Sequence, residues 1–273
     1  MTMMRGFSTV ACGDATFAEV IRWAKGCNMQ AIEIRLDKNN EICGLTREEL
    51  VPYLQELKEA GIIISDLGSN ITLGPYMSEK VERLKKIVEL ASFVGAKGIR
   101  LFLGRYISRK DQITLEDTPD VIRFLKETAC FAREKGVELW IENHYSYSAC
   151  ADVRPLLDAV GEENVKVLWD ILHSAEFNES PEQAIGYVGS EIAHVHIKNG
   201  RPAADAGQLT FDHTDMFDGI VPIKEALQAL KKINYQGSLS LEWESMWHPE
   251  LASMYPDIPT LLNAYHRYLD ENQ

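Results

Sequence analysis

Four short apolar runs in the second half of the chain each end in a side chain that can bind a divalent metal ion. They end in Glu142 (ELWIENH), Asp170 (VKVLWDILH), His196 (AHVHIKN) and Glu242 (SLSLEWES). Three carboxylates and one imidazole form an oxygen-rich set that suits Mn²⁺, Mg²⁺ or Co²⁺, tolerates Zn²⁺, and differs from a thiolate structural zinc site. The pattern therefore predicts one divalent metal ion as a cofactor and chemistry on the oxygen atoms of a substrate.

Eight runs with strand character recur along the chain, and stretches with helical spacing of apolar residues separate them. Helix signals include Pro181 at a first turn and Gly95 at an end, and no Ser/Gly/Pro-rich linker divides the chain. Residues 199–218 form the longest stretch without clear periodicity. This pattern predicts the α/β class and a single (β/α)₈ TIM-barrel domain over residues 1–273, with an open doubly wound sheet as the competitor. The eight runs cover residues 7–10, 31–35, 62–65, 98–104, 138–143, 165–170, 193–198 and 238–243.

The metal-ligand pattern favours the barrel over the open sheet. In a barrel the carboxyl ends of all strands meet at one mouth, whereas the outer strands of an open sheet lie far apart. Side chains two residues apart on a strand face the same way, so His194, His196 and Lys198 share one face. We expect His194, which lies deeper on the strand, to be a packed and hydrogen-bonded core residue and not a ligand.

The charge balance excludes some classes of partner. The chain has 41 acidic and 28 basic residues, a net charge of −13, which repels both a nucleic-acid backbone and an anionic membrane. The N-terminus lacks the apolar core of a signal peptide, and no run approaches the ~18 apolar residues of a membrane span. The five cysteines form no CxxC pair, which argues against a disulfide framework. We therefore predict a cytoplasmic protein with no nucleic-acid or membrane partner.

Nearly the whole chain resembles the xylose isomerase-like, AP endonuclease family 2 barrels, which include sugar isomerases, ketose 3-epimerases, inosose dehydratases and endonuclease IV. The resemblance rests on IEN with Glu142, WDxxH with Asp170, HVHIK with His196 and SLSLEWE with Glu242. It implies that these four residues bind one divalent ion. It also implies that Glu142 and Glu242 move protons on opposite faces of a hydroxyketone, through an enediolate that the ion stabilises. The implied protein is an isomerase or epimerase of a small sugar or polyol derivative, and a homodimer or homotetramer.

Five further side chains are predicted to contact the substrate. His173, three residues beyond Asp170, would hydrogen-bond a substrate oxygen, bind a second metal, or be a loop histidine with a backbone partner. Lys198 would neutralise a developing enediolate or pair with an acid in the mouth. The loops after strands seven and eight, where barrels bind phosphate, contain no Gly-rich segment, so an unphosphorylated substrate is favoured. The five predicted substrate contacts are His173, Lys198, Arg201, His144 and Glu33, and weaker candidates for the mouth are Arg35, Arg105, Tyr106, Tyr145, Trp243 and Trp247.

A metal-dependent sugar or inosose dehydratase is the nearest alternative. It needs the same proton abstraction and, in addition, a general acid for the departing hydroxyl, a role open to His173 or Lys198. The ketose 3-epimerases have an Arg six residues beyond the strand-seven His, whereas this chain has Pro202 there, beside Arg201. That difference weakens the prediction of a 3-epimerase specifically.

Two further alternatives are disfavoured. An enzyme like endonuclease IV needs histidines after strands three and four, but residues 1–143 contain none. It also needs an Asp-x-His in the loop after strand seven, whereas Asp212 and His213 are adjacent. A non-catalytic metal- or sugar-binding barrel is disfavoured because Glu142 and Glu242 are both retained.

Overall fold

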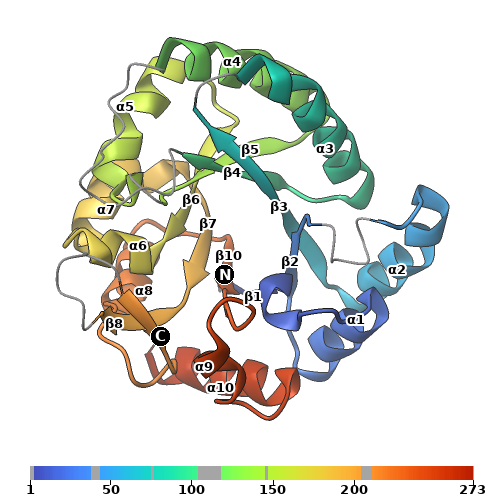
Figure 1. The fold of residues 1–273 in the computed structure, drawn as a ribbon, viewed down its shortest axis with the longest axis vertical. Coiled ribbons are helices and arrows are strands. Elements are labelled where there is room, and N and C mark those ends of the chain that lie inside the picture. The colour runs from blue at the N-terminus through green and yellow to red at the C-terminus, as the bar shows by residue number, and fades with distance from the viewer. Residues whose placement is uncertain are drawn as a thin grey trace.

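Eight parallel strands close into a barrel in the computed structural model of the protein (Figure 1). The structure describes residues 3–37, 44–74, 77–103, 118–144, 147–203 and 211–272. Strand β1 pairs in parallel with both β2 and β10, and this closes the ring. The predicted (β/α)₈ barrel is thus confirmed, and the open sheet is wrong. The barrel strands, in order around the ring, are β1 (Met4–Ser8), β2 (Ala31–Arg35), β3 (Ile63–Leu73), β4 (Gly98–Leu103), β5 (Glu138–Glu142), β6 (Val165–Asp170), β7 (Ile192–Ile197) and β10 (Ser238–Leu241).

Helices surround the barrel and bury their apolar faces against it (Figure 1). Helices α1, α2 and α7 each begin with a capping box, in which a Thr or Ser side chain and the Glu or Gln three residues later bond each other's backbone N–H groups. None of the helices in the described segments has the length and apolar character needed to cross a membrane. The helices are α1 (Phe17–Gly26), α2 (Arg47–Ala60), α3 (Val81–Val94), α4 (Thr118–Glu134), α5 (Cys150–Val160), α6 (Ile171–Glu176), α7 (Pro181–Val188), α8 (Ile223–Lys232), α9 (Pro249–Ala252) and α10 (Ile258–Asn272), with short 3₁₀ helices η1 (Thr9–Cys12), η3 (Met77–Lys80) and η6 (Gly189–Glu191).

Most of the predicted strands agree with the structure to within two residues at each end, and the first and third differ most. The first strand was predicted at residues 7–10 but ends at Ser8, because the Ser8 side chain accepts a hydrogen bond from the Val10 N–H and starts η1. The third was predicted at 62–65 but continues to Leu73, because its pairing with β4 shifts register between Gly68 and Thr72. Such irregular pairing lets polar residues continue a strand that a simple alternation pattern would end.

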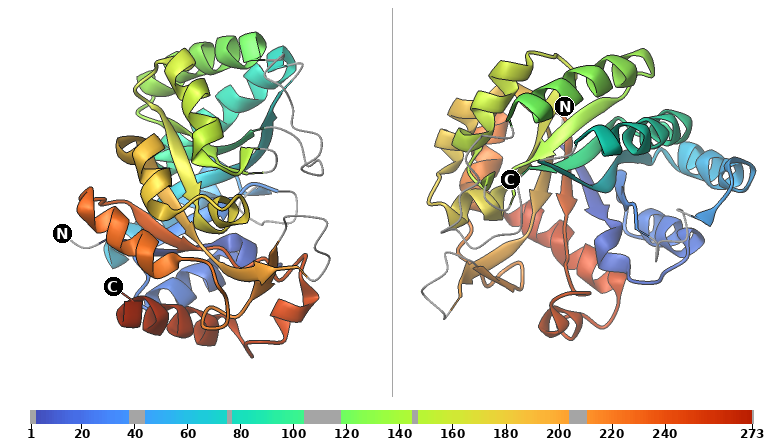
Figure 2. Two further views of the ribbon diagram at one scale, coloured as in Figure 1. Left: turned by 90° about the vertical axis from the view of Figure 1, so that its left-hand side faces the viewer. Right: turned by 45° about the horizontal axis from the view of Figure 1, so that its top comes forward.

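The mouth of the barrel, at the carboxyl ends of the strands, is extended by two segments. The stretch predicted to lack periodicity contains an antiparallel ribbon directly after β7, formed by β8 (Asn199–Pro202) and β9 (Phe211–Thr214). Helix α9 follows β10, and Figure 2 (left) shows it on the side of the barrel opposite both chain termini. The ribbon and α9 therefore form part of the rim around the mouth.

Candidate metal centre

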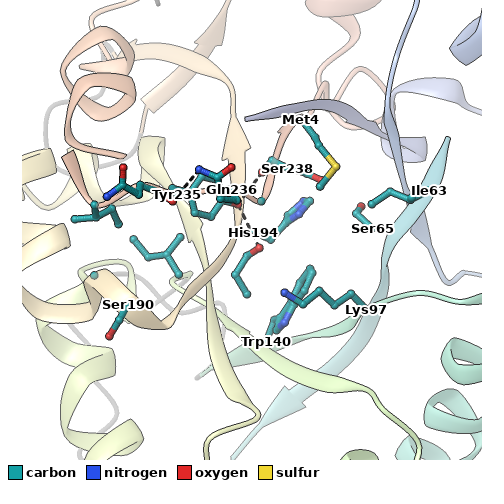
Figure 3. A pocket seen from close by; sticks show the side chains of 16 residues that line it. Met4, Ile63, Ser65, Lys97, Trp140, Ser190, His194, Tyr235, Gln236 and Ser238 are labelled. Carbon is teal, nitrogen blue, oxygen red and sulfur yellow. Dashed lines mark hydrogen bonds between the residues drawn. The ribbon is translucent and has the colours of Figure 1, made fainter. Parts of the chain in front are cut away.

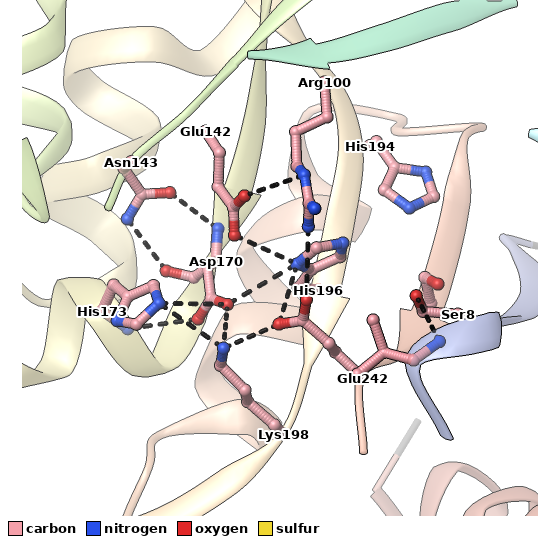
Figure 4. A network of polar contacts seen from close by, with 12 residues as sticks. Ser8, Arg100, Glu142, Asn143, Asp170, His173, His194, His196, Lys198 and Glu242 are labelled. Atoms are coloured by element: carbon pink, nitrogen blue, oxygen red, sulfur yellow. Dashed lines mark hydrogen bonds and ion pairs between the residues drawn. The ribbon is translucent and has the colours of Figure 1, made fainter. Parts of the chain in front are cut away.

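The structure brings the four predicted metal ligands together at the mouth (Figure 4). Glu142 and Asp170 are the last residues of β5 and β6, His196 is the penultimate residue of β7, and Glu242 directly follows β10. All four side chains are buried, and one ligand atom from each lies within 4.8 Å of the others. The four side chains therefore lie on the inner face of the barrel, the face that strand parity in the sequence predicts.

The geometry of the four side chains fits a divalent ion. Nδ1 of His196 lies 3.3 Å from Oε1 of Glu142, 3.6 Å from Oδ2 of Asp170 and 3.2 Å from Oε2 of Glu242. Neither this Nδ1 nor either carboxylate oxygen of Glu142 makes a hydrogen bond within the described part of the chain. A buried polar atom without a hydrogen bond costs about 1–3 kcal/mol, more if charged. Three oxygens and one nitrogen that converge in this way suit an ion such as Mn²⁺ or Mg²⁺.

The second ring nitrogen of His196 is held by Glu33. Nε2 of His196 lies 2.8 Å from Oε2 of Glu33, and the Glu33 carboxylate also accepts hydrogen bonds from Ser8 and Ser240. Once Nδ1 has lost its proton, an N–H on Nε2 that donates to Glu33 leaves the lone pair of Nδ1 directed at the other ligands, the arrangement common around metal-binding histidines. Glu33 was predicted to contact the substrate. The structure places it fully buried beneath His196, so we interpret it as a residue that orients a ligand.

Replacement of Glu33 by Gln is expected to lower the affinity for Mn²⁺ about 10- to 100-fold, because the His196 ring loses its charged partner. Titration calorimetry on metal-free protein measures this affinity. Glu138→Gln is the matched control, since that carboxylate contacts Trp140 and Lys97 and no predicted ligand. An unchanged affinity in the Glu33 variant would show that Glu33 does not orient His196.

Arg100, which was not predicted from the sequence, joins the two proposed acid/base residues. Its Nε lies 3.4 Å from Oε2 of Glu142, and its Nη1 lies 3.4 Å from Oε1 of Glu242. The side chain comes from β4 and is buried, and Gly68 leaves room for it, since a Cβ there would lie 3.3 Å from Nη2. Burial opposes the charge of Arg100, but the carboxylates of Glu142 and Glu33 raise its pKa, so the guanidinium stays positive. The sequence GIRLFLG does contain a signal for an inward-facing Arg100, because strand parity turns residues 98, 100 and 102 to one face.

Lys198 is the second buried cation of the site. Its Nζ lies 2.9 Å from Oδ2 of Asp170, 2.7 Å from Oε2 of Glu242 and 2.7 Å from Oε1 of Glu244. Burial alone would lower the pKa of Lys198, but these carboxylates raise it well above its usual range. Fixed positive groups beside Glu142 and Glu242 can stabilise negative charge that develops on a substrate.

His173 and His144 lie beside Glu142 and form one wall of the site, and their contact with a substrate stays a prediction. Nε2 of His173 lies 3.4 Å from Nζ of Lys198, and Nδ1 lies 2.9 Å from Oε2 of Glu176. The His144 ring meets the His173 ring edge-on, with centroids 4.2 Å apart. Burial alone would lower the pKa of His173, but the Asp170 carboxylate raises it. The pKa of His144 is lowered by burial and by the nearby charge of His173. The wall thus holds one imidazole that binds a proton readily and one that stays neutral.

The structure does not bring Arg201 to the metal ligands. This side chain lies on β8, is half-exposed, and pairs with Asp218 through Nη2 and Oδ1 at 2.7 Å. The predicted contact of Arg201 with the substrate is unsupported, because β8 leaves the mouth and directs this side chain to solvent. Among the weaker candidates, Arg35 lies over the Trp247 ring at 4.2 Å, and Trp243 is buried. Arg105, Tyr106 and Tyr145 lie outside the described residues.

A cavity of about 450 Å³ lies away from the metal centre, at the amino end of the strands (Figure 3). Met4, Ile63 and Ser238, from the starts of three strands, contribute to its lining. His194 also lines it, stacked on Trp140 with centroids 5.3 Å apart and with Nε2 3.2 Å from Glu33. His194 is therefore the packed, hydrogen-bonded residue predicted from the sequence, and this cavity is not part of the metal centre.

Metal binding should strengthen as the pH rises. Burial opposes a proton on His196, but the carboxylates of Glu242 and Glu33 raise its pKa well above the usual value in the metal-free protein. An incoming ion must displace that proton, so affinity falls by about tenfold per pH unit below this pKa for each proton released. Calorimetric Mn²⁺ titrations in two buffers of different ionisation enthalpy measure the release. Binding that is independent of pH and releases no proton would be inconsistent with His196 as a ligand.

Comparison with known proteins places the chain in a family. Its sequence matches the family described as xylose isomerase-like TIM barrel over residues 21–261. The chain belongs to this family. One relative of this xylose isomerase-like barrel is a Haemophilus influenzae protein provisionally assigned as L-ribulose-5-phosphate 3-epimerase SgbU. The two are 23% identical over 246 residues, 86% of this chain and 85% of that protein. Pyridoxine 5'-phosphate synthase of Aquifex aeolicus is 29% identical over 120 residues, and the match spans less than half of that enzyme, 44% of its length.

Solved structures of other proteins share the fold of this xylose isomerase-like barrel. One of them is AsbF of Bacillus anthracis, which is provisionally assigned as a 3-DHS dehydratase involved in petrobactin synthesis. It superposes with a TM-score of 0.77 at 18% identity, and the match covers 99% of this chain and 100% of AsbF. D-Psicose 3-epimerase of Clostridium cellulolyticum H10, solved with D-tagatose, has a TM-score of 0.78 at 16% identity, covering 99% and 98%. These relatives are enzymes, but identities this low show the fold alone.

Proposed function

We propose that this protein is a divalent-metal-dependent isomerase or epimerase that acts on a small, unphosphorylated sugar or polyol-derived hydroxyketone. The observation that carries the proposal is the placement of Glu142 and Glu242, which both approach Nδ1 of His196 and share the Arg100 guanidinium. Two carboxylates thus face one small volume. Glu142, Asp170, His196 and Glu242 would hold the ion, which supplies a Lewis acid that polarises carbonyl and hydroxyl oxygens.

The protein's own residues supply the proton transfers. Burial opposes the negative charge of Glu242, but His196 and Lys198 lower its pKa well below the usual range, so the carboxylate is ionised as a base must be. One glutamate takes the proton from the carbon beside the carbonyl, and the negative charge of the resulting enediolate develops near Arg100 and Lys198. Return of a proton to the neighbouring carbon gives an isomer, and return to the opposite face gives an epimer. The epimerases among the relatives support this proposal.

A dehydratase is the second candidate, and His173 is the observation that favours it. Although burial opposes it, the Asp170 carboxylate raises the pKa of this imidazole, and His173 lies beside Lys198 on the wall of the site. After the same proton abstraction, the carbon–oxygen bond of a β-hydroxyl breaks, a carbon–carbon double bond forms, and His173 gives its proton to the departing oxygen as water. The fold shared with AsbF supports this candidate.

Exchange in D₂O distinguishes the two functions. Mn²⁺-loaded protein is incubated with a panel of ketoses and cyclic polyhydroxy ketones, and the products are identified by NMR and mass spectrometry. Deuterium in recovered substrate or in an isomer, with no loss of oxygen, supports the isomerase or epimerase. An unsaturated product that has lost one water supports the dehydratase, and His173→Gln should then retain exchange but lose elimination. No exchange and no product with any compound in the panel would contradict both.

A further inference from the structure

Three side chains at the rim of the mouth form a cluster separate from the four central ligands. His213 lies on β9, Glu244 follows β10, and His248 directly precedes α9. One ligand atom from each lies within 4.8 Å of the others. The rings of His213 and His248 stack, with centroids 4.4 Å apart and planes 21° apart. Two rim segments, one after β7 and the other after β10, thus converge on this cluster, which we call the rim cluster.

His213 is a buried imidazole available to a ligand. Its side chain is 9% exposed, and the carboxylate it approaches, Glu244, lies 4.0 Å away at Oε1, beyond hydrogen-bonding distance. The His213 ring makes no hydrogen bond within the described part of the chain. Burial lowers the pKa of His213 to about 4, so the ring is neutral near pH 7 and has a lone pair to donate. A neutral ring without a hydrogen bond, turned toward a carboxylate, is suited to binding a cation.

We infer that His213, Glu244 and His248 form a second divalent-metal site, which takes a borderline cation such as Zn²⁺ or Co²⁺. Two imidazoles and one carboxylate are the protein ligands of a class of catalytic zinc sites, which leave a fourth position open to water or substrate. The central ligands, with three carboxylates, suit the harder Mn²⁺ or Mg²⁺. The two sites therefore differ in the ions they prefer.

Small side-chain movements complete the rim site. Ligand atoms about 2.0–2.1 Å from a tetrahedral zinc ion lie about 3.3 Å apart, so the rim cluster must close by up to about 1.5 Å. His248 is the side chain placed to move, because it is 33% exposed and precedes a helix of only four residues. Its Nδ1 lies 3.3 Å from Oε1 of Glu250, a contact that leaves Nε2 for the ion.

The rim cluster is connected to the metal centre through Lys198. Nζ of Lys198 lies 2.7 Å from Oε1 of Glu244 and 2.7 Å from Oε2 of Glu242. An ion at the rim would use the other oxygen of Glu244 and leave this ammonium between the two carboxylates. With its open position at the mouth, the rim ion would bind an oxygen of the substrate remote from the reacting carbon. Binding of an ion at the rim goes beyond the proposed function and does not depend on it, whereas the contact with a substrate oxygen rests on that function.

Metal stoichiometry of the untagged full chain tests the inference. Metal-free protein is titrated with Co²⁺, and the ions bound are counted by elemental analysis while the visible absorption reports coordination by histidine. We expect two ions in the wild type and one in His248→Gln. Asp170→Asn, which removes a central ligand, should also retain one ion. His266→Gln is the control, since His266 lies on α10 and contacts Arg5 of β1, and it should retain both ions.

The outcomes separate this inference from the metal centre. Both sites are supported if the wild type binds two ions and if His248→Gln and Asp170→Asn each lose one of them. A single ion that Asp170→Asn removes and His248→Gln retains overturns the rim site and leaves the metal centre intact. A single ion that His248→Gln removes and Asp170→Asn retains supports the rim site alone. Two ions in the wild type and in both His248→Gln and His213→Gln overturn the rim site, and circular dichroism confirms that each variant is folded.

Discussion

Replacement of Glu242 by Gln is expected to lower kcat by about 10²- to 10⁴-fold, with little change in substrate affinity. The amide keeps the size of the side chain and an oxygen for the ion, but it cannot take or return a proton near neutral pH. Its contacts with Lys198 and Arg100 also change from charged to dipolar, so the two cations lose the partner that holds them beside the substrate. Turnover should therefore fall more than binding.

The measurement compares kcat and substrate affinity at a saturating Mn²⁺ concentration, because Glu242 is also a proposed metal ligand. Glu162→Gln is the control, since that carboxylate pairs with Arg133 on the outer surface and should leave both values unchanged. Turnover like that of the wild type in the Glu242 variant, on an identified substrate, would exclude the two-glutamate mechanism.

Replacement of Arg100 by Met is expected to lower the free energy of unfolding of the metal-free protein by about 3–5 kcal/mol. The Arg100 guanidinium lies among the carboxylates of Glu33, Glu142 and Glu242, which are buried with it. Methionine fills much of the same volume but leaves these negative charges without their shared cation. The cost of unpaired buried charge, and not the loss of packing, therefore dominates the effect.

Chemical denaturation of the metal-free variant measures this loss. Arg133→Met removes a cation of the same type from the exposed pair with Glu162 and should cost about 0–1 kcal/mol. Saturating Mn²⁺ should restore part of the stability of the Arg100 variant, because an ion that binds only the folded state replaces some of the lost positive charge. Equal losses in the two arginine variants would show that the guanidinium of Arg100 does not balance the buried carboxylates.

The barrel and its four central ligands could be predicted because their pattern is local. Each ligand ends an apolar run, and the two-residue period of a strand places Asp170 and His196 on the inner face without knowledge of the rest of the fold. Parallel pairing then aligns strand ends, and the structure pairs Asp170 directly with His196. Convergence of the carboxyl ends in a barrel supplies the remaining constraint.

The roles of Glu33 and Arg100 could not be predicted in the same way, because they depend on pairs of residues far apart in sequence. Glu33 lies on β2 and contacts His196 on β7 across the barrel interior, and 163 positions separate the two residues. Arg100 reaches Glu242 over 142 positions. Strand parity turns such side chains inward, but the depth at which each one lies depends on the stagger of the strands and on the register shift in β3.

Glu142, Asp170, His196 and Glu242 are expected to bind one divalent ion together. The most direct measurement is an anomalous difference map, collected at the manganese absorption edge, from a crystal of the Mn²⁺-loaded protein. We predict a peak bonded to Nδ1 of His196 and to a carboxylate oxygen of each of the three acids. The absence of a peak at this position, or a map in which Glu142 or Glu242 points away from the ion, would show that these four residues do not form the metal site.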